Sequence, residues 1–339
     1  MKETEIFLKD KENCNENFTH IEDGITDPIL KEIDELYGAA DVLSMEHAKT
    51  HHWNLWFLSV FGAATAFLFL LYDEAELHLL VFGCIVCIIL IYISLEYTER
   101  KESHRKYTQY RLLAECLRVQ YFLSIAGIKK NVSDILPWFV KAGVPWINEV
   151  LSELPQTNTN EKKPIINCWI RNQRDYHYKA RVRLTRQHEK ESRTGRRVIY
   201  ITIATYLIAA LFEIYMMISP TGEINIDILN GILTALQQWN IMVGYDQVDM
   251  IRAVLKIVLG TMSVITLFVG SYYGKMALSN TIDDHRRMEM LYEQCINKIL
   301  QNNEEESEEL ILKLAQEFLI ENSTWYAYQK NNQPDLTFE

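Results

Sequence analysis

The sequence predicts an all-α integral membrane protein, in which four transmembrane helices form two hairpins with long cytoplasmic helical extensions. Two observations predict it: four almost uncharged apolar runs have the length of a membrane span, and Lys and Arg gather on one side of them. Average composition hides this pattern, because 48% hydrophobic residues and a net charge of -11 over 339 residues would also suit a soluble protein. The local distribution of apolar residues therefore decides the fold class.

The four expected spans are residues 53–72, 77–95, 198–218 and 254–276. A bilayer core of roughly 30 Å requires about 20 helical residues, which each run comes close to or exceeds. Only residues 73–76 separate the first two spans, so these two form a tight hairpin. Four buried helices of a soluble protein are the alternative, and so many long runs in one chain make it the weaker interpretation.

Basic residues predict the orientation, because Lys and Arg are retained on the cytoplasmic side of a membrane. They cluster after the second span, before the third and after the fourth. The first hairpin tip has none, and residues 219–252 contain only Arg252. Both termini and the central connector are therefore expected in the cytoplasm, and both hairpin tips on the other side.

The remaining segments divide the chain into two repeats with the same order of cytoplasmic helix, hairpin and cytoplasmic helix. Residues 1–26 are polar and acidic and are expected to form a flexible arm, followed by the first helical repeat over residues 27–155. A polar linker covers residues 156–164, the second repeat covers 165–303, and an acidic helix covers 304–339. Internal two-fold organisation is common among proteins that move solutes.

Sequence likeness between the two repeats is faint. The pair His104-Arg105 follows the second span, and the pair His285-Arg286 follows the fourth. Chance would also explain two such dipeptides, so the duplication is predicted from architecture and not from identity.

Polar residues inside the spans have two interpretations. Glu213 is the one acid within a span, and Lys256 begins the fourth span from the same side of the membrane. An ionisable residue in a membrane is a functional hypothesis by default, but a structural Glu213–Lys256 pair explains both residues equally well. Thr261 and Thr266 in the fourth span fit a pore lining, although hydrogen bonding between helices is the favoured interpretation.

Small residues predict close helix contacts and hence an oligomer. Gly270 and Gly274 form a G-x-x-x-G pair, and Gly62 lies in a similar small-residue stretch of the first span. Cys84 and Cys87 form a C-x-x-C inside an apolar run, where a packing role fits better than a metal or redox role.

The basic connector before the third span alternates arginines with aromatic residues, a combination that suits phosphate contacts and base stacking. Membrane topology and anionic lipid explain the arginines nearest the third span, and ion pairs with acids of neighbouring helices would explain the others. Candidate residues for binding an anionic ligand are Arg171, Arg174, Tyr178, Arg181 and Arg183, together with Arg105 and Arg111 after the second span.

Catalytic signatures are missing from the sequence. Neither a phosphate-binding glycine loop, nor a zinc-protease motif, nor a nucleophile elbow occurs. The nine histidines show no carboxylate spacing that suggests a metal site. No enzymatic activity, cofactor or metal is therefore predicted.

Two segments resemble the SLATT family of bacterial membrane effectors. They are YRLLAECLRVQYFLSIAGI at 110–128 and WIRNQRDYHYKARVRL at 169–184. With the hairpins, the resemblance covers about residues 35–300, and the four-span layout is most similar to the channel effectors of Hailong-type anti-phage defence. These segments are helix-packing patterns, so they transfer no ligand-binding residue.

The resemblance implies a homo-oligomeric ion channel, expected to be a tetramer, in the inner membrane of a bacterium. It further implies that a DNA oligomer or nucleotide made by a partner nucleotidyltransferase holds the channel closed, and that opening depolarises the cell in abortive infection. Two alternatives remain open: a membrane-anchored nucleotide sensor or scaffold without a pore, and an ion-coupled transporter that uses Glu213.

Overall fold

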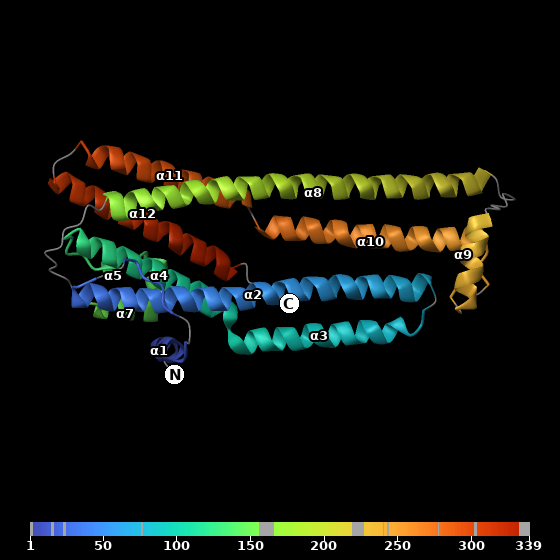
Figure 1. The fold of residues 1–339 in the computed structure, drawn as a ribbon, viewed down its shortest axis with the longest axis horizontal. Coiled ribbons are helices and arrows are strands. Elements are labelled where there is room, and N and C mark those ends of the chain that lie inside the picture. Colours follow the sequence, from blue (N-terminus) through green and yellow to red (C-terminus); the bar gives the residue numbers. More distant parts are fainter. Residues whose placement is uncertain are drawn as a thin grey trace. The chain divides into compact units, whose positions relative to one another are not determined.

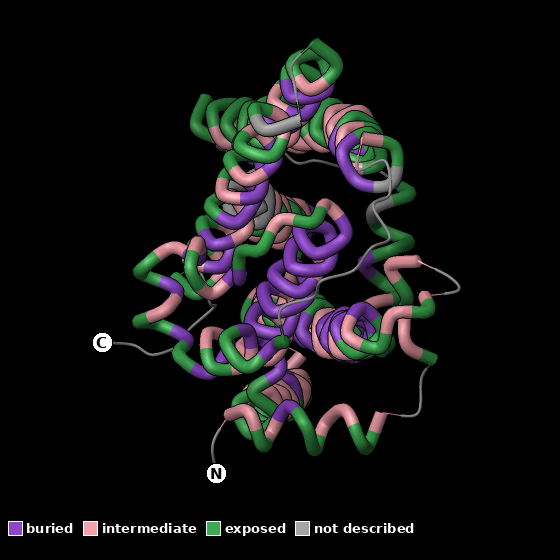
Figure 2. Tube along the Cα trace, turned by 90° about the vertical axis from the view of Figure 1, so that its left-hand side faces the viewer, coloured by how far each residue is buried: buried purple, intermediate pink, exposed green. Residues whose placement is uncertain are grey.

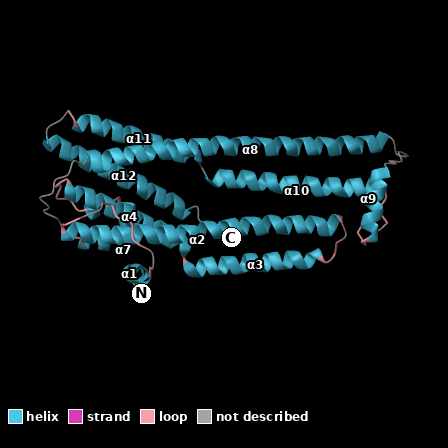
Figure 3. Cartoon of the chain, in the orientation of Figure 1, coloured by secondary structure: helices cyan, strands magenta, loops and turns pink. Residues whose placement is uncertain are grey.

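The computed structural model is helical throughout its described part, with no strand in that part (Figure 3). Contacts divide the chain into two units. We call Met1–Trp53, Thr98–Val182 and Asp283–Glu339 the head unit, and Asn54–Tyr97 with Arg183–Ile282 the span unit. The structure describes residues 3–14, 17–22, 25–75, 77–155, 166–218, 227–239, 241–242, 244–276, 278–301 and 304–331.

Two long helices connect these units by continuity of the chain. Helix α2 covers Pro28–Glu74 and α8 covers Arg171–Ile218, and each is an uninterrupted ribbon in Figure 1. Asp27 caps α2, since its carboxylate accepts hydrogen bonds from the backbone N–H of Ile29 at 2.8 Å and Leu30 at 3.3 Å. The expectation that the first cytoplasmic helix and the first span form one helix is confirmed.

The span unit contains four helices long and apolar enough to cross a membrane, as predicted. Besides the second halves of α2 and α8, these are α3 (Leu80–Lys101) and α10 (Gln247–Met276). In the most apolar stretch of each helix, at most 11% of the residues are buried inside the chain. The spans therefore leave most of their surface for lipid or for other copies.

One helix of the span unit was not expected. Helix α9 (Asp227–Gln238) lies in the segment between the third and fourth spans, which the sequence pattern presented only as a loop. Its Leu233 packs in a small cluster with Ala75, Met242 and Ala253. The strong amphipathic pattern of residues 227–238 explains why this connection is helical.

The head unit is built around α4 (Ser103–Ile125), most of which is buried. Glu102 precedes it with a φ of 48°, in the left-handed region, and this residue separates α4 from α3. The C-terminal helix α12 (Glu304–Asn331) packs on α4, with Leu314, Phe318 and Leu319 in the core. Figure 2 shows the buried residues gathered on the inner helices of the end that faces the viewer.

Three short helices follow α4 at the end of the first repeat. They are α5 (Val132–Ile135), α6 (Trp138–Gly143) and α7 (Pro145–Glu153). Pro137 precedes α6 and Pro145 begins α7, because proline lacks the N–H that a continuous helix needs. Trp146 is buried in the core of the unit, whereas Trp138 is exposed.

The expectation that residues 1–26 form a flexible arm is wrong. Residues Glu3–Asn13 form helix α1, and Phe7 is only 1% exposed, with ring contacts to Tyr110 at 5.3 Å and Trp146 at 5.9 Å. Acidic composition suggested a solvated arm, but burial of one aromatic ring and ion pairs to α4 fix the helix. The linker over residues 156–164 lies outside the described residues.

Helix α11 (Leu278–Ile299) completes the head unit after the fourth span. The expectation of a helix to about residue 300 is confirmed for its described residues, and Ala277 between α10 and α11 lies outside them. The π-helical turn Ile166–Ile170 precedes α8 and buries Trp169 against Phe122 of α4.

Candidate functional site

Polar side chains pair across the second hairpin of the span unit. The Thr202 hydroxyl on α8 lies 2.9 Å from that of Thr266 on α10, and the Tyr206 hydroxyl lies 2.9 Å from that of Ser263. Further along α8, Glu213 accepts two hydrogen bonds of 3.0 Å from the Arg252 guanidinium. We call these three pairs the polar seam.

Helix periodicity explains why the seam is continuous. Positions 202, 206 and 213 are separated by four and seven residues, so they share one face of α8. Positions 252, 263 and 266 likewise share one face of α10, in the antiparallel order that the hairpin requires. At 1.5 Å per residue the seam extends about 16 Å along α8, which is roughly half of a bilayer core.

A groove of about 300 Å³ lies at the charged end of the seam. Small side chains at Ala209 and Ala210 leave this space open between Tyr206 and Glu213. On α10 the lining residues are Arg252, Leu255, Lys256 and Leu259. A concave, partly apolar space with a few convergent polar groups is the usual form of a small-molecule or ion site.

Glu213 does not form an ion pair with Lys256, the partner that one interpretation of the sequence suggested. Glu213 pairs with Arg252, while the Lys256 ammonium lies 3.1 Å from Glu74 at the end of α2. Arg252 precedes Lys256 by four residues on the same face of α10, and its longer bidentate side chain fits the carboxylate better than an ammonium does. Lys256 still lines the same groove as Glu213.

The two candidate threonines of the fourth span form different hydrogen bonds. Thr266 belongs to the seam, whereas Thr261 hydrogen-bonds the backbone carbonyl of Ile257 on its own helix at 2.7 Å. Thr266 also bonds its own helix, at 2.8 Å to the Met262 carbonyl. The expected contact between helices is thus formed by Thr266, and neither threonine lines the groove.

Glycines of the spans face different surroundings. A Cβ on Gly62 or Gly270 would meet nothing within 4 Å in the chain, whereas a Cβ on Gly260 would lie 2.8 Å from Leu70 side-chain atoms. Gly260 therefore packs within the chain, and Gly62 and Gly270 leave open surface. The side-chain surroundings of Gly274 lie outside the described residues.

The candidate ligand-binding arginines fall into two groups. Arg174 pairs with Glu293 at 2.9 Å, and Arg181 pairs with Glu289 at 2.7 Å, both on α11. Tyr178 lies under the Arg181 guanidinium, whose carbon is 5.5 Å from the ring centroid. For Arg174 and Arg181 the structure favours the alternative that they pair with acids of a neighbouring helix.

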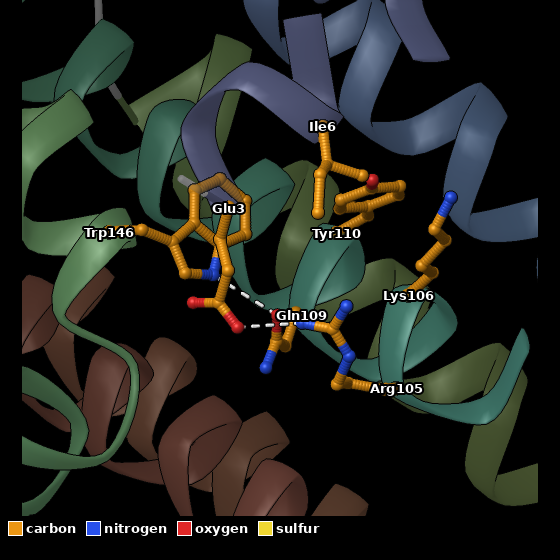
Figure 4. A pocket seen from close by; sticks show the side chains of 7 residues that line it. All are labelled: Glu3, Ile6, Arg105, Lys106, Gln109, Tyr110 and Trp146. Atoms are coloured by element: carbon orange, nitrogen blue, oxygen red, sulfur yellow. Dashed lines mark hydrogen bonds and ion pairs between the residues drawn. The ribbon is translucent and has the colours of Figure 1, made fainter. Parts of the chain in front are cut away.

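Arg105 and Arg111 are also engaged inside the head unit. Arg105 pairs with Glu3 of α1 at 2.7 Å and with Glu102, beside a cavity of only about 10 Å³ that has room for one water at most (Figure 4). Arg111 contacts Asp41 at 2.9 Å and Glu115 at 2.5 Å, and the Glu115 charge raises the pKa of this guanidinium. Both arginines therefore form ion pairs within the head unit.

Arg171 and Arg183 are exposed on α8. Arg171 bonds the Asn167 side chain at 2.8 Å, and Arg183 has no acidic partner in the described part of the chain. Arg183 begins a row of exposed basic side chains spaced by three or four residues, which places them on one face of α8. We call this row the basic stripe: Arg183, Arg186, Lys190, Arg193 and Arg197.

The stripe is nearly free of compensating acids. Arg193 lies 3.7 Å from Glu189 on the same helix, and the other four members have no acidic partner among the described residues. The sequence pattern selected Arg171, Arg174, Arg181 and Arg183, of which Arg183 belongs to the stripe, whereas Arg174 and Arg181 pair with acids of α11. Helical spacing alone would have shown that the arginines paired with α11 and the basic stripe lie on different faces of α8.

No family model matches the chain, and neither curated proteins nor solved structures gave a match.

Proposed function

We propose that the protein is a homo-oligomeric, pore-forming ion channel of the bacterial inner membrane, with a conduction path lined by the second hairpin. The observation that carries this proposal is the polar seam with its groove, in a hairpin that exposes many large apolar side chains. Ionisable groups within a membrane face water or a partner, because exposure to lipid is costly.

Assembly of several copies would cover the open helix surfaces and enclose the conduction path, which a single chain cannot do. The spans bury few residues within the chain, and Gly62 and Gly270 leave surface where another helix can approach closely. A closed ring of copies, for which we expect four, would place the seams around a common axis. Water in that axis would satisfy the groups of the groove.

Control of the pore is assigned to an oligonucleotide that binds the basic stripe. The stripe extends over residues 183–197, about 21 Å at 1.5 Å per residue, which is long enough for several phosphates of a single strand. Helix α8 is continuous from Arg171 to Ile218, so a ligand on the stripe acts on the same helix that forms the seam. The SLATT resemblance of residues 110–128 and 169–184 supports a ligand that holds the channel closed in anti-phage defence.

Ion flux from proteoliposomes tests the channel. Purified full-length protein should discharge a potassium gradient passively, and addition of a single-stranded DNA oligomer should reduce that flux. Absence of flux with and without the oligomer, in vesicles shown to contain correctly inserted protein, would contradict the proposal and favour the membrane-anchored sensor.

Fluorescence anisotropy tests the ligand. The triple variant Arg183→Gln, Arg186→Gln, Lys190→Gln should weaken binding of labelled single-stranded DNA and flatten its salt dependence by about two units of slope, since each lost phosphate contact removes about 0.7. The matched control Arg286→Gln, Arg287→Gln, Lys313→Gln removes the same charge from side chains paired with acids on their own helices. Equal losses in both variants would remove the stripe from the site.

A transporter is the second candidate, because Glu213 and Arg252 form their pair inside a groove large enough for a small solute. Counterflow separates it from a channel: a transporter exchanges labelled substrate against an unlabelled gradient and saturates, whereas channel flux grows with the driving force.

A further inference from the structure

Three side chains from separate helices of the head unit converge in a way the proposed channel does not use. They are His177 of α8, His285 of α11 and Glu321 of α12, and one donor atom of each lies within 4.8 Å of the others. The helices that bring them together are labelled in Figure 1. More than a hundred residues separate His177 from His285, so no local spacing in the sequence announces the group.

The two imidazoles face each other directly. Nδ1 of His177 lies 2.9 Å from Nδ1 of His285, so at most one proton is shared between them. The His177 side chain is buried. Its Nε2 is buried and has no hydrogen-bond partner within the described residues.

Glu321 adds a carboxylate with no counter-charge in contact. It forms no hydrogen bond or ion pair among the residues that the structure describes, and the carboxylates of Glu115 and Asp284 and the guanidinium of Arg287 all act on it electrostatically. A dication beside this group would add positive charge next to these acids. Buried carboxylates commonly pair with a cation or coordinate a metal.

A second histidine pair in the same unit shows what an ordinary structural contact looks like. His51 of α2 and His104 of α4 lie 3.3 Å apart, and His104 Nε2 lies 3.0 Å from the backbone carbonyl oxygen of Gln329. Because a carbonyl oxygen only accepts, His104 Nε2 donates to it, and His104 Nδ1 accepts from His51 Nε2. No carboxylate completes a group of three metal ligands there among the described residues.

We infer that His177, His285 and Glu321 bind one transition-metal dication, with Zn²⁺ as the best fit. Two imidazoles and one carboxylate are a known zinc donor set, with a fourth position left for water. At zinc–nitrogen distances of about 2.0–2.1 Å, a tetrahedral site needs about 3.3 Å between the two nitrogens. The observed 2.9 Å requires only a small outward rotation of the rings.

Such an ion would cross-link three helices. Helix α8 continues into the third span and α11 follows the fourth, while α12 packs on α4 at the centre of the head unit. Metal binding would thus stabilise the head unit by mass action, because the unfolded chain lacks the assembled site. This inference is independent of the channel proposal and has its own readout.

Metal binding to the full-length protein, purified without a histidine tag and stripped with chelator, tests the site. Wild type should bind one Zn²⁺ per chain by elemental analysis after gel filtration, show intense tetrahedral visible bands with Co²⁺, and gain several degrees in Tm. His285→Gln should abolish these signals, and Glu321→Gln should lower Zn²⁺ affinity by tenfold or more.

Two matched variants keep the test specific. Glu317→Gln removes an exposed carboxylate one turn earlier on α12, and His104→Gln removes a histidine of the other pair; both should bind Zn²⁺ as wild type does. No stoichiometric binding by wild type, or binding that survives in both His285→Gln and Glu321→Gln, would overturn the inference. So would binding lost in His104→Gln alone.

Discussion

The two repeats share an architecture but differ in the chemistry that joins their helices. In the first hairpin, the Cys84 thiol of α3 donates a weak hydrogen bond of 3.7 Å to the Thr65 carbonyl of α2. In the second, three polar pairs cross between α8 and α10. The histidine pairs also differ between the repeats. In the first repeat, one histidine of the pair hydrogen-bonds a backbone carbonyl, whereas in the second repeat the pair lies beside Glu321.

This difference indicates a division of labour. An apolar hairpin needs nothing beyond lipid and helix packing, whereas a seam with an ion pair requires water or a further partner to be stable in a membrane. We therefore propose that the second repeat contains the conduction path and that the first provides packing surface.

The largest effect is expected at the ion pair of the seam. Glu213→Gln leaves Arg252 unpaired in the groove and should reduce ion flux from proteoliposomes at least tenfold. The charge swap Glu213→Arg with Arg252→Glu should restore flux to within a few fold, because the pair is re-formed. In the first hairpin, Thr65→Val should leave flux unchanged; equal loss in Thr65→Val and Glu213→Gln would erase the contrast.

The second-largest effect is expected on oligomer formation. Gly270→Leu places a bulky side chain on open surface, so the monomer should fold while the oligomer dissociates, as measured by native mass spectrometry. Gly260→Ala should instead leave the oligomer intact, since its Cβ would meet only the end of the Leu70 side chain, 2.8 Å away, which can shift within the chain. An intact oligomer in the Gly270→Leu variant would show that this face contacts only lipid.

The histidine pair of the first repeat should make stability depend on pH. Burial, together with His104 and His52, lowers the pKa of His51 to about 4 from its ordinary 6.5. Between these values the unfolded chain binds more protons than the folded one, so stability is lost as pH falls from 6.5 to 4, by about 3 kcal/mol at most.

His51→Gln should remove this part of the pH dependence. The Tm of the variant in detergent should change less between pH 6.5 and pH 4 than that of wild type, while Lys49→Gln on the exposed face of α2 serves as the control. A wild-type slope in His51→Gln would mean that other groups, such as the second histidine pair, account for the acid sensitivity.

The smallest effect is expected from the hydroxyl pairs. Ser263→Ala and Thr266→Val each remove one hydrogen bond between helices, which in membrane proteins is worth about 0.6 kcal/mol on average. Flux should change by about twofold or less in either variant, and helix insertion should be normal. A loss as large as that of Glu213→Gln would assign the conduction path to the hydroxyls instead of the ion pair.

Much of the fold could be predicted because membrane spans depend on local composition. Four apolar runs, the Asp27 helix start and the continuity of α2 and α8 all follow from patterns within about 20 residues. The break at Glu102 could not be predicted, because no glycine or proline marks it and the left-handed φ depends on packing. Helix α1 was missed because a single buried ring, Phe7, decides its docking.

The candidate site was predicted in composition but not in its pairings. Glu213 and Thr266 were selected correctly as polar residues of the spans, yet Arg252 was assigned to the loop because the start of α10 at Gln247 lacks a clear signal. Tyrosine and threonine are ordinary residues of membrane helices, so the sequence gives no reason to select Tyr206 or Thr202. Only their hydrogen-bond partners in the structure identify them as part of the seam. The group of His177, His285 and Glu321 depends on tertiary contacts between distant helices.

Substituted-cysteine accessibility tests the central claim, a water-filled path along the second hairpin, most directly. In a chain whose own cysteines are replaced by alanine, Ala209→Cys lies in the groove and Ala66→Cys lies in the first hairpin. The account predicts that a cationic, water-soluble thiol reagent blocks flux through the Ala209→Cys channel and leaves the Ala66→Cys channel unaffected. Block of the Ala66→Cys channel without block at Ala209→Cys would contradict it.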